Sequence, residues 1–268
     1  MKPIRLCVLD LDGTVLDPDR EVPIAEPVVK AVARVLERGI GVTLATGRTL
    51  EYAAPRAQAL GIDLPLVTSQ GAVVGGAQGV VWQKTIPDEA ARSALAWADR
   101  SHHVVAAYSH DTIVQNKETE PAAVYDHLFG AGRVVRPDLS RALAGEPLVK
   151  FIVVNEPDIE AQLRLLMEPE IAVVRTHARL IEGTAAGVNK GSGLAKLLEL
   201  LAIEPGETMV VGDNDNDLPM FALAGLSVAM GQATPAVQQA ADWVAPSFYE
   251  HGVTAALERF LLDSATGS

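Results

Sequence analysis

Short apolar runs in this sequence end in polar residues, and polar side chains at such places could meet in one site. The first run, Ile4–Leu9, ends in Asp10-Leu11-Asp12-Gly13-Thr14, and Lys190 stands just before a helical stripe of leucines. The residues whose types and places could do chemistry are Asp10, Asp12, Thr46, Gly47, Arg48, Lys190, Asp213, Asn216 and Asp217. A single aspartate at a strand end is often only a helix cap, and that interpretation stays open for each one alone.

Taken together, these residues predict a phosphoryl-transfer site. Several carboxylates at one point repel one another, so a cation or a proton must neutralise some of them. Oxygen ligands with open positions suit Mg²⁺, which accepts substrate phosphate. Lys190 would add a second positive charge, and the hydroxyls of Thr14 and Thr46 would donate hydrogen bonds. A carboxylate can itself attack phosphorus and form an aspartyl-phosphate.

The elements that must position these residues are those of a parallel α/β sheet. Ile4–Leu9, Val42–Ala45 and Leu66–Thr68 are apolar runs without polar alternation, as in strands buried on both faces. Helical patterns separate them, one around Val28–Leu36 that ends at Gly39 and one over Glu51–Leu60. Ligands of such sheets bind beyond the carboxyl ends of the strands, where the polar residues stand.

The middle of the chain predicts a second, smaller domain. Val104–Tyr108 and Ile113–Gln115 are close-set strand candidates, and Ile171–Arg175 with Leu180–Glu182 predicts a hairpin. This spacing favours an α+β domain with an antiparallel sheet, inserted into the parallel one. We therefore expect a core over residues 1–82 and 184–268 and an inserted domain over 83–183, near the usual domain size of ~100 residues.

The motifs and their order resemble those of the haloacid dehalogenase superfamily of aspartate-nucleophile phosphatases. The narrower resemblance is to the Cof-like branch, which carries the larger α/β cap of type IIB. The four motifs are Asp10–Thr14, Thr46-Gly47-Arg48, Asn189-Lys190-Gly191 and Gly212–Asp217. The resemblance implies a Rossmann-like core, with a cap inserted between the second and third motifs.

The resemblance also implies a role for each site residue. Asp10 would attack phosphorus, and Asp12 would act as general acid and then as general base. The phosphate would be bound by Thr46, Gly47, Arg48, Lys190 and Asn216. Magnesium would be held by Asp10, Asp12 through its backbone carbonyl, and Asp213, with Asp217 in the metal site as an acceptor that orients a metal-bound water or Lys190. Arg48 keeps a second interpretation, a pair with an acidic residue near the cap.

Three places that carry glutamine depart from the family pattern. Many relatives carry asparagine where this chain has Gln70 and Gln232, and a lysine further on is replaced near Gln238 and Gln239. The asparagine positions lie at the rim of the site in relatives. These departures leave the expected chemistry intact, but substrate contacts of the relatives cannot be transferred to this chain at these positions.

Composition excludes several other classes of protein. The chain has 268 residues with a formal net charge of −12, so its surface repels nucleic acid and anionic lipid. Aromatic residues make up 4%, too few to favour a base-stacking surface. The only cysteine, Cys7, cannot form an internal disulfide, and no apolar run approaches a membrane span. We expect a cytoplasmic protein, either a monomer or a weak homo-oligomer.

Two further motif interpretations fail on the chemistry they require. Asp213, Asp215 and Asp217 imitate the start of a calcium loop, but Leu218 and Ala224 stand where it needs glycine and glutamate. Gly75–Gly79 lacks the lysine of a nucleotide loop, and we expect a hairpin turn there. The sequence thus predicts a magnesium-dependent phosphatase acting on a small phosphate ester. A phosphomutase or phosphotransferase using the same intermediate, or a catalytically silent binding module, remains open.

Overall fold

A computed structural model describes residues 2–17, 20, 22–109, 112–118, 133–154, 159–177 and 179–263, without the side chains of residues 176 and 177. Its contacts divide the chain into two compact units, Met1–Trp82 with Asn189–Ser268, and Gln83–Val188. The expected boundary after residue 183 is wrong by five residues. It falls inside β11 (Leu180–Ala185), which pairs with its neighbour as far as Ala185.

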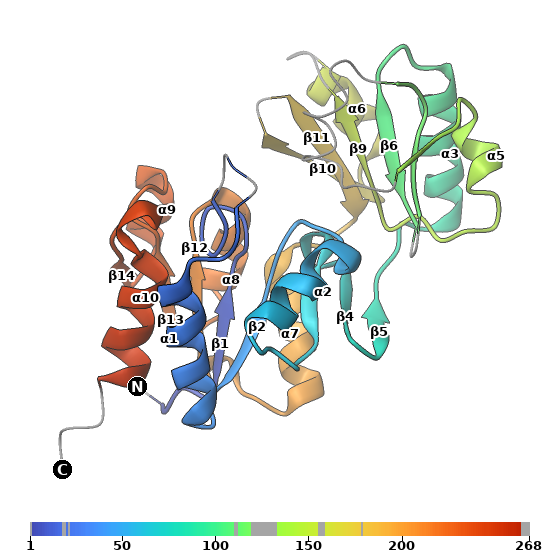
Figure 1. The fold of residues 1–268 in the computed structure, drawn as a ribbon. Coiled ribbons are helices and arrows are strands. Elements are labelled where there is room, and N and C mark those ends of the chain that lie inside the picture. Colours follow the sequence, from blue (N-terminus) through green and yellow to red (C-terminus); the bar gives the residue numbers. More distant parts are fainter. Residues whose placement is uncertain are drawn as a thin grey trace. The chain divides into compact units, whose positions relative to one another are not determined.

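The first unit is built on a parallel sheet with the strand order β14-β13-β12-β1-β2 (Figure 1). The strands are β1 (Leu6–Leu9), β2 (Gly41–Leu44), β12 (Thr208–Gly212), β13 (Leu226–Ala229) and β14 (Trp243–Val244). All four strand pairs are parallel, and β1 lies between β12 and β2. The chain segments before and after the second unit therefore meet in one sheet, and the parallel α/β fold predicted for the core is confirmed.

Apolar side chains cover both faces of this sheet, as the uninterrupted apolar strands require. Cys7 and Leu9 join the cluster formed with α1 (Glu26–Glu37), α2 (Leu50–Ala59) and α10 (Gly252–Leu257). Leu6 and Val8 face the opposite cluster, formed with α7 (Lys190–Leu201), α8 (Leu218–Phe221) and α9 (Pro235–Ala240). Burial raises the pKa of the Cys7 thiol to about 12, in accord with its expected role as a small buried apolar residue.

The run Leu66–Thr68, expected as a third parallel strand, forms a strand that pairs mainly with an antiparallel neighbour. This strand, β3, pairs antiparallel with β4 (Val73–Gly76), and β5 (Gly79–Gln83) lies beside β4. Its link to the parallel sheet is a single bridge between Ala45 and Val67. The reason is the tight turn η1 (Ser69–Gly71), which reverses the chain directly after β3. The hairpin expected at Gly75–Gly79 is present.

The second unit contains a mixed sheet in the order β10-β11-β9-β6-β7-β8, antiparallel except between β7 and β8. Its strands are β6 (Val105–Tyr108), β7 (Ile113–Gln115), β8 (Val134–Val135), β9 (Lys150–Val154), β10 (Ile171–His177) and β11. Its helices among the described residues are α3 (Asp88–Arg100), α5 (Leu139–Ala142) and α6 (Ile159–Met167). The predicted α+β character is confirmed, although the sequence analysis did not anticipate α3, α5 or β8.

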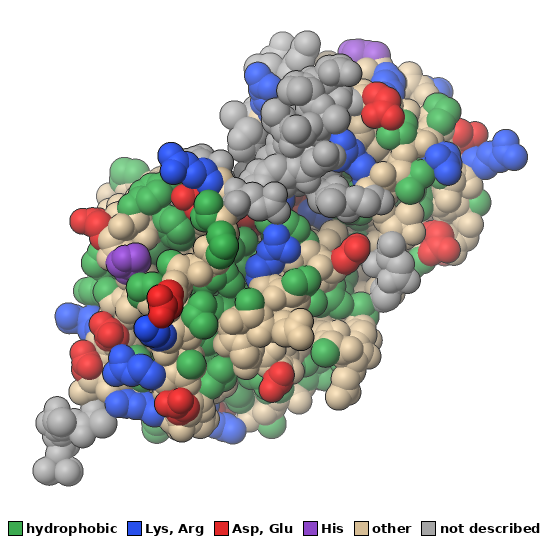
Figure 2. All heavy atoms as spheres, in the orientation of Figure 1, with side chains coloured by type: hydrophobic (Ala, Val, Ile, Leu, Met, Phe, Trp, Pro, Cys, Tyr) green, Lys and Arg blue, Asp and Glu red, His purple; other side chains and the backbone are tan. Residues whose placement is uncertain are grey.

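Two surface observations bear on the expected partners. On the face shown in Figure 2, the acidic and basic side chains of the described residues are interspersed and form no single basic patch. Within the described part of the chain, no helix combines the length and the apolar character that crossing a membrane requires.

Candidate active site

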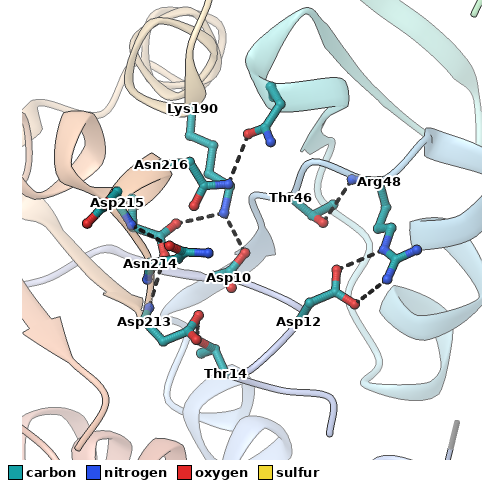
Figure 3. Close-up of polar contacts among 12 residues, drawn as sticks. Asp10, Asp12, Thr14, Thr46, Arg48, Lys190, Asp213, Asn214, Asp215 and Asn216 are labelled. Atoms are coloured by element: carbon teal, nitrogen blue, oxygen red, sulfur yellow. Dashed lines mark hydrogen bonds and ion pairs between the residues drawn. The ribbon is translucent and has the colours of Figure 1, made fainter. Parts of the chain in front are cut away.

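Two aspartates meet because β1 and β12 are parallel neighbours. Asp10 follows the last residue of β1, and its backbone N–H donates to the Val211 carbonyl at 2.9 Å. Asp213 follows the last residue of β12. Parallel strands end at the same edge of a sheet, so both carboxylates project from that edge (Figure 3).

Lys190 is brought to these carboxylates by the first turn of α7. Asn189 caps the helix: its side chain accepts from the Ser192 N–H, and the Ser192 side chain bonds back to the cap. Lys190 Nζ donates to Asp10 Oδ1 at 2.6 Å and to Asp217 Oδ1 at 2.7 Å. Its relative exposure is 2%, so the ammonium is buried between the two carboxylates. Figure 3 shows Lys190 directed at Asp10.

Glycines allow this close approach at two points. A Cβ on Gly191 would lie 2.4 Å from the Pro219 carbonyl oxygen, and one on Gly212 would lie 2.5 Å from the Asp217 carboxylate. Neither position has room for a larger residue. These glycines let the start of α7 and the end of β12 pack directly against the loop that carries Asp217.

Asp217 organises the loop in which it stands. Its Oδ2 accepts hydrogen bonds from the backbone N–H groups of Asp213 at 2.9 Å and Asn214 at 3.0 Å. Its Oδ1 is held by Lys190. Both oxygens are therefore engaged, which favours the orienting role that the family resemblance implied over direct metal ligation.

The protonation of the cluster follows from burial and charge. Burial raises the pKa of Asp10 well above its usual range; the Lys190 ammonium opposes this, and the Asp217 and Asp213 carboxylates add to it. Burial, with the Asp217 charge, raises the pKa of Asp213 to about 6. Burial alone would lower the pKa of Lys190, but the Asp10 and Asp217 carboxylates outweigh it and raise that pKa. Lys190 thus stays charged and holds two carboxylates.

The same carboxylates form a cradle that fits a cation. Ligand atoms of Asp10, Asp213 and Asp217 all lie within 4.8 Å of one another. A Cβ on Gly13 would be 2.3 Å from Asp213 Oδ2, and Gly13 has a φ of +86°, so glycine is required where the backbone passes this carboxylate. Hard oxygen donors of this kind suit Mg²⁺. The donor set therefore fits the metal that the sequence predicts.

Asp12 and Arg48 are placed differently from the expected phosphate-binding arrangement. Arg48 donates from Nε and Nη2 to the two carboxylate oxygens of Asp12, both at 2.9 Å (Figure 3). The Arg48 guanidinium also lies 4.8 Å from the centre of the Tyr52 ring. Arg48 therefore pairs with Asp12, in the loop after β1, whereas the expected acidic partner was one near the cap.

Thr46 and Asn216, the other residues expected to bind phosphate, each make a hydrogen bond within the site. Thr46 Oγ1 accepts from the Arg48 backbone N–H at 3.1 Å, so the hydroxyl proton remains available to donate. Asn216 Nδ2 donates to Gln70 Oε1 at 3.1 Å. A Cβ on Gly47 would lie 2.7 Å from Gln70 Nε2, so the Gln70 amide rests on Gly47.

Gln70 and Gln232 stand where relatives carry asparagines at the rim of the site, and both contact the loops that carry the site residues. Gln232 Nε2 donates to the Gly13 carbonyl at 2.6 Å, and Gln232 Oε1 accepts from the Phe248 N–H at 2.8 Å. Gln70 contacts Gly47 and Asn216. The signal in the sequence was the departure of both positions from the family pattern.

Comparisons with known proteins agree with this geometry. A family model described as haloacid dehalogenase-like hydrolase matches residues 7–257. The chain belongs to this family. It is therefore an enzyme of the hydrolase class, and the family expected from the motifs is confirmed.

Individual relatives cover nearly the whole chain. The 5-amino-6-(5-phospho-D-ribitylamino)uracil phosphatase YcsE of Bacillus subtilis is 27% identical over 97% of this chain and 96% of its own length. A phosphoglycolate phosphatase of Methanopyrus kandleri is 28% identical, over 96% of this chain and 97% of its own. The crystal structure of TM0651 from Thermotoga maritima has a TM-score of 0.85 and 28% identity, covering 96% of this chain and 97% of that one. The family, the site and these relatives together support a phosphatase activity.

Replacing Lys190 with methionine should expose its electrostatic role. Two buried carboxylates would lose their partner, so we expect a fall in the free energy of unfolding of about 3–5 kcal/mol at about pH 8. The fall should shrink at about pH 5, where the carboxylates can take up protons instead. Urea unfolding of the metal-free protein at both pH values measures this.

The matched control is Lys196→Met, which removes a solvent-exposed pair with Glu199 on the same helix. That change should cost at most about 1 kcal/mol at either pH. A pH-independent loss for Lys190→Met, or a loss no larger than the control's, would contradict the assigned role of the buried ammonium.

Neutralising Asp213 should stabilise the protein when no metal is present. Its pKa of about 6 lies above the usual carboxyl value. An acid whose pKa is higher in the folded than in the unfolded state destabilises the fold as the pH rises through about 4–6, and the cost persists above. Metal-free Asp213→Asn should therefore melt higher than wild type at about pH 8. Added Mg²⁺ should raise the melting temperature of the wild type but not of the variant.

Asp215→Asn provides the control, because Asp215 is an exposed residue of the same loop. It should change neither the metal-free melting temperature nor the response to Mg²⁺. A lower melting temperature for metal-free Asp213→Asn, or an undiminished response to Mg²⁺, would refute the placement of Asp213 in the metal cradle.

Proposed function

We propose that this protein is a magnesium-dependent phosphatase that hydrolyses a small phosphorylated metabolite through an aspartyl-phosphate on Asp10. The observation that carries the proposal is the buried Asp10 carboxylate, held through Oδ1 by Lys190 beside the Asp213 carboxylate. This arrangement fixes one oxygen of Asp10 and leaves Oδ2 as the oxygen that Lys190 does not hold. A fixed carboxylate is a suitable nucleophile towards phosphorus.

In the first step, Asp10 Oδ2 attacks phosphorus and the bond from phosphorus to the ester oxygen breaks. The electron pair goes to the leaving oxygen, which takes a proton from Asp12. Lys190 and the Thr46 hydroxyl bind phosphate oxygens as charge shifts onto them. Asp10, Asp213 and the Asp12 backbone carbonyl would hold a Mg²⁺ ion, which would supply a further positive charge for the phosphate oxygens.

In the second step, water attacks phosphorus and Asp12 accepts a proton from it, so that phosphate leaves and the Asp10 carboxylate is restored. The pair with Arg48 bears on both steps, because the guanidinium holds both carboxylate oxygens of Asp12 at 2.9 Å. To exchange a proton with the leaving oxygen or with water, Asp12 must present one of these oxygens to the phosphorus site, so its contact with Arg48 must loosen.

The substrate class follows from the phosphate-binding residues only in general terms. Sugar phosphates, nucleotides and phosphorylated cofactors are the candidates. Relatives of similar identity are named for a ribitylaminouracil phosphate and for phosphoglycolate, so similarity at this level does not select among them.

The direct test measures phosphate and para-nitrophenol release from para-nitrophenyl phosphate, with Mg²⁺ and with a chelator. We expect release that depends on Mg²⁺ and falls at least about a thousandfold in Asp10→Asn, because the amide cannot act as the nucleophile. Equal amounts of phosphate and para-nitrophenol indicate hydrolysis.

Circular dichroism and a melting curve control for the fold of Asp10→Asn. Turnover retained in a folded Asp10→Asn protein would refute the nucleophile. Release that a chelator leaves unchanged would refute the metal requirement. Para-nitrophenol without matching phosphate, with the phosphoryl group found on an added sugar, would favour a phosphotransferase instead.

A further inference from the structure

The turn that follows β3 is conformationally unusual. Ser69, Gln70 and Gly71 have φ values of 51°, 60° and 92°, three successive residues in the left-handed region. That region favours glycine, and two of these residues carry side chains, so the turn costs free energy. Strain of this kind persists where the surrounding structure imposes it, and it often marks a functional position.

The turn is hydrogen-bonded to the loop Thr46-Gly47-Arg48, which the family resemblance assigns to phosphate binding. The Ser69 N–H donates to the Arg48 carbonyl at 2.8 Å, and the Gln70 N–H donates to the Thr46 carbonyl at 3.2 Å. The left-handed backbone at Gln70 directs its side chain over Gly47, with Nε2 2.7 Å from where a Cβ would stand. A side chain at position 47 would therefore displace the Gln70 amide from this place.

From this place, Gln70 fixes the rotation of the Asn216 carboxamide. Asn216 Nδ2 donates to Gln70 Oε1 at 3.1 Å. Asn216 Oδ1 is buried and has no hydrogen-bond partner among the described residues. The hydrogen bond to Gln70 therefore determines which way round the Asn216 amide lies.

The chemistry of that contact decides what Asn216 offers. Because Gln70 presents an acceptor, it selects the nitrogen of Asn216 at this side. An amide nitrogen carries two hydrogens, so one remains to donate after Gln70 has accepted the other. A phosphate oxygen is an acceptor and requires such a donor. If the Asn216 amide were reversed, its Oδ1, an acceptor, would stand where the Nδ2 donor now lies.

We propose that Gln70 is a positioning residue for the phosphate group, acting through Asn216. It orients the Asn216 amide so that an N–H faces the anion, and the strained turn is what places Gln70 there. This inference rests on the proposed function, since it assigns the phosphate as the group that Asn216 binds.

Three variants test the role, with inorganic phosphate as the probe. Its binding in the presence of Mg²⁺ is measured by calorimetry and as competitive inhibition of para-nitrophenyl phosphate hydrolysis. Gln70→Gly removes the amide and relieves the left-handed strain. Ser69→Gly relieves the same kind of strain one residue earlier and keeps Gln70. Asn216→Ala removes the group on which Gln70 acts.

We expect Gln70→Gly to weaken phosphate binding about three- to tenfold, the effect of one misplaced hydrogen bond, while its melting temperature does not fall. Ser69→Gly should bind phosphate as wild type does. In the Asn216→Ala background, Gln70→Gly should have no further effect, because residues acting through one contact are not additive.

A loss of binding in Ser69→Gly equal to that in Gln70→Gly would mean that the turn acts only through its backbone, which overturns the proposal. So would additive losses in the double variant. If wild type binds phosphate and Gln70→Gly binds it equally well, only the role of Gln70 is refuted. If wild type with Mg²⁺ binds no phosphate, both this inference and the proposed function are contradicted.

Discussion

The site depends on one buried ammonium group shared by two carboxylates. Lys190 pairs with Asp10 at 2.6 Å and with Asp217 at 2.7 Å, and all three side chains are shielded from solvent. A charge buried without a partner is costly, so the burial of each of the three groups depends on the other two. With Asp213, the cluster places three carboxyl groups around one ammonium. A divalent cation would favour their ionised forms, which gives it a physical reason to bind here.

The surrounding fold is arranged to bring these groups together. The parallel pairing of β1 with β12 places Asp10 beside the loop that carries Asp213 and Asp217. The capped first turn of α7 supplies Lys190, and Gly191 allows the helix to approach that loop. Each of these elements comes from a part of the chain that is distant in sequence. The core is thus assembled from segments on both sides of the second unit.

Much of this arrangement could be predicted from the sequence, because apolar runs identify buried strands and the ends of parallel strands meet. The grouping of Asp10, Lys190 and Asp213 follows from that rule and from the motifs. The partner of Arg48 could not be predicted, since the choice between substrate and Asp12 depends on the conformation of two loops 36 residues apart. Nor could the role of Gln70, because nothing in its residue type indicates a left-handed backbone. The end of the second unit was misplaced for a similar reason, as local composition does not show how far β11 remains paired.

The measurement that tests the central claim most directly is a rapid acid quench of Asp12→Asn during reaction with para-nitrophenyl phosphate and Mg²⁺, followed by peptide mapping. Para-nitrophenol leaves without needing a proton, so the first step should proceed, while loss of the general base slows the second. The account predicts a burst of para-nitrophenol stoichiometric with the enzyme and a phosphoryl group recovered on Asp10. A burst with the phosphoryl group on another residue, or turnover that never passes through a phosphorylated enzyme, would contradict it.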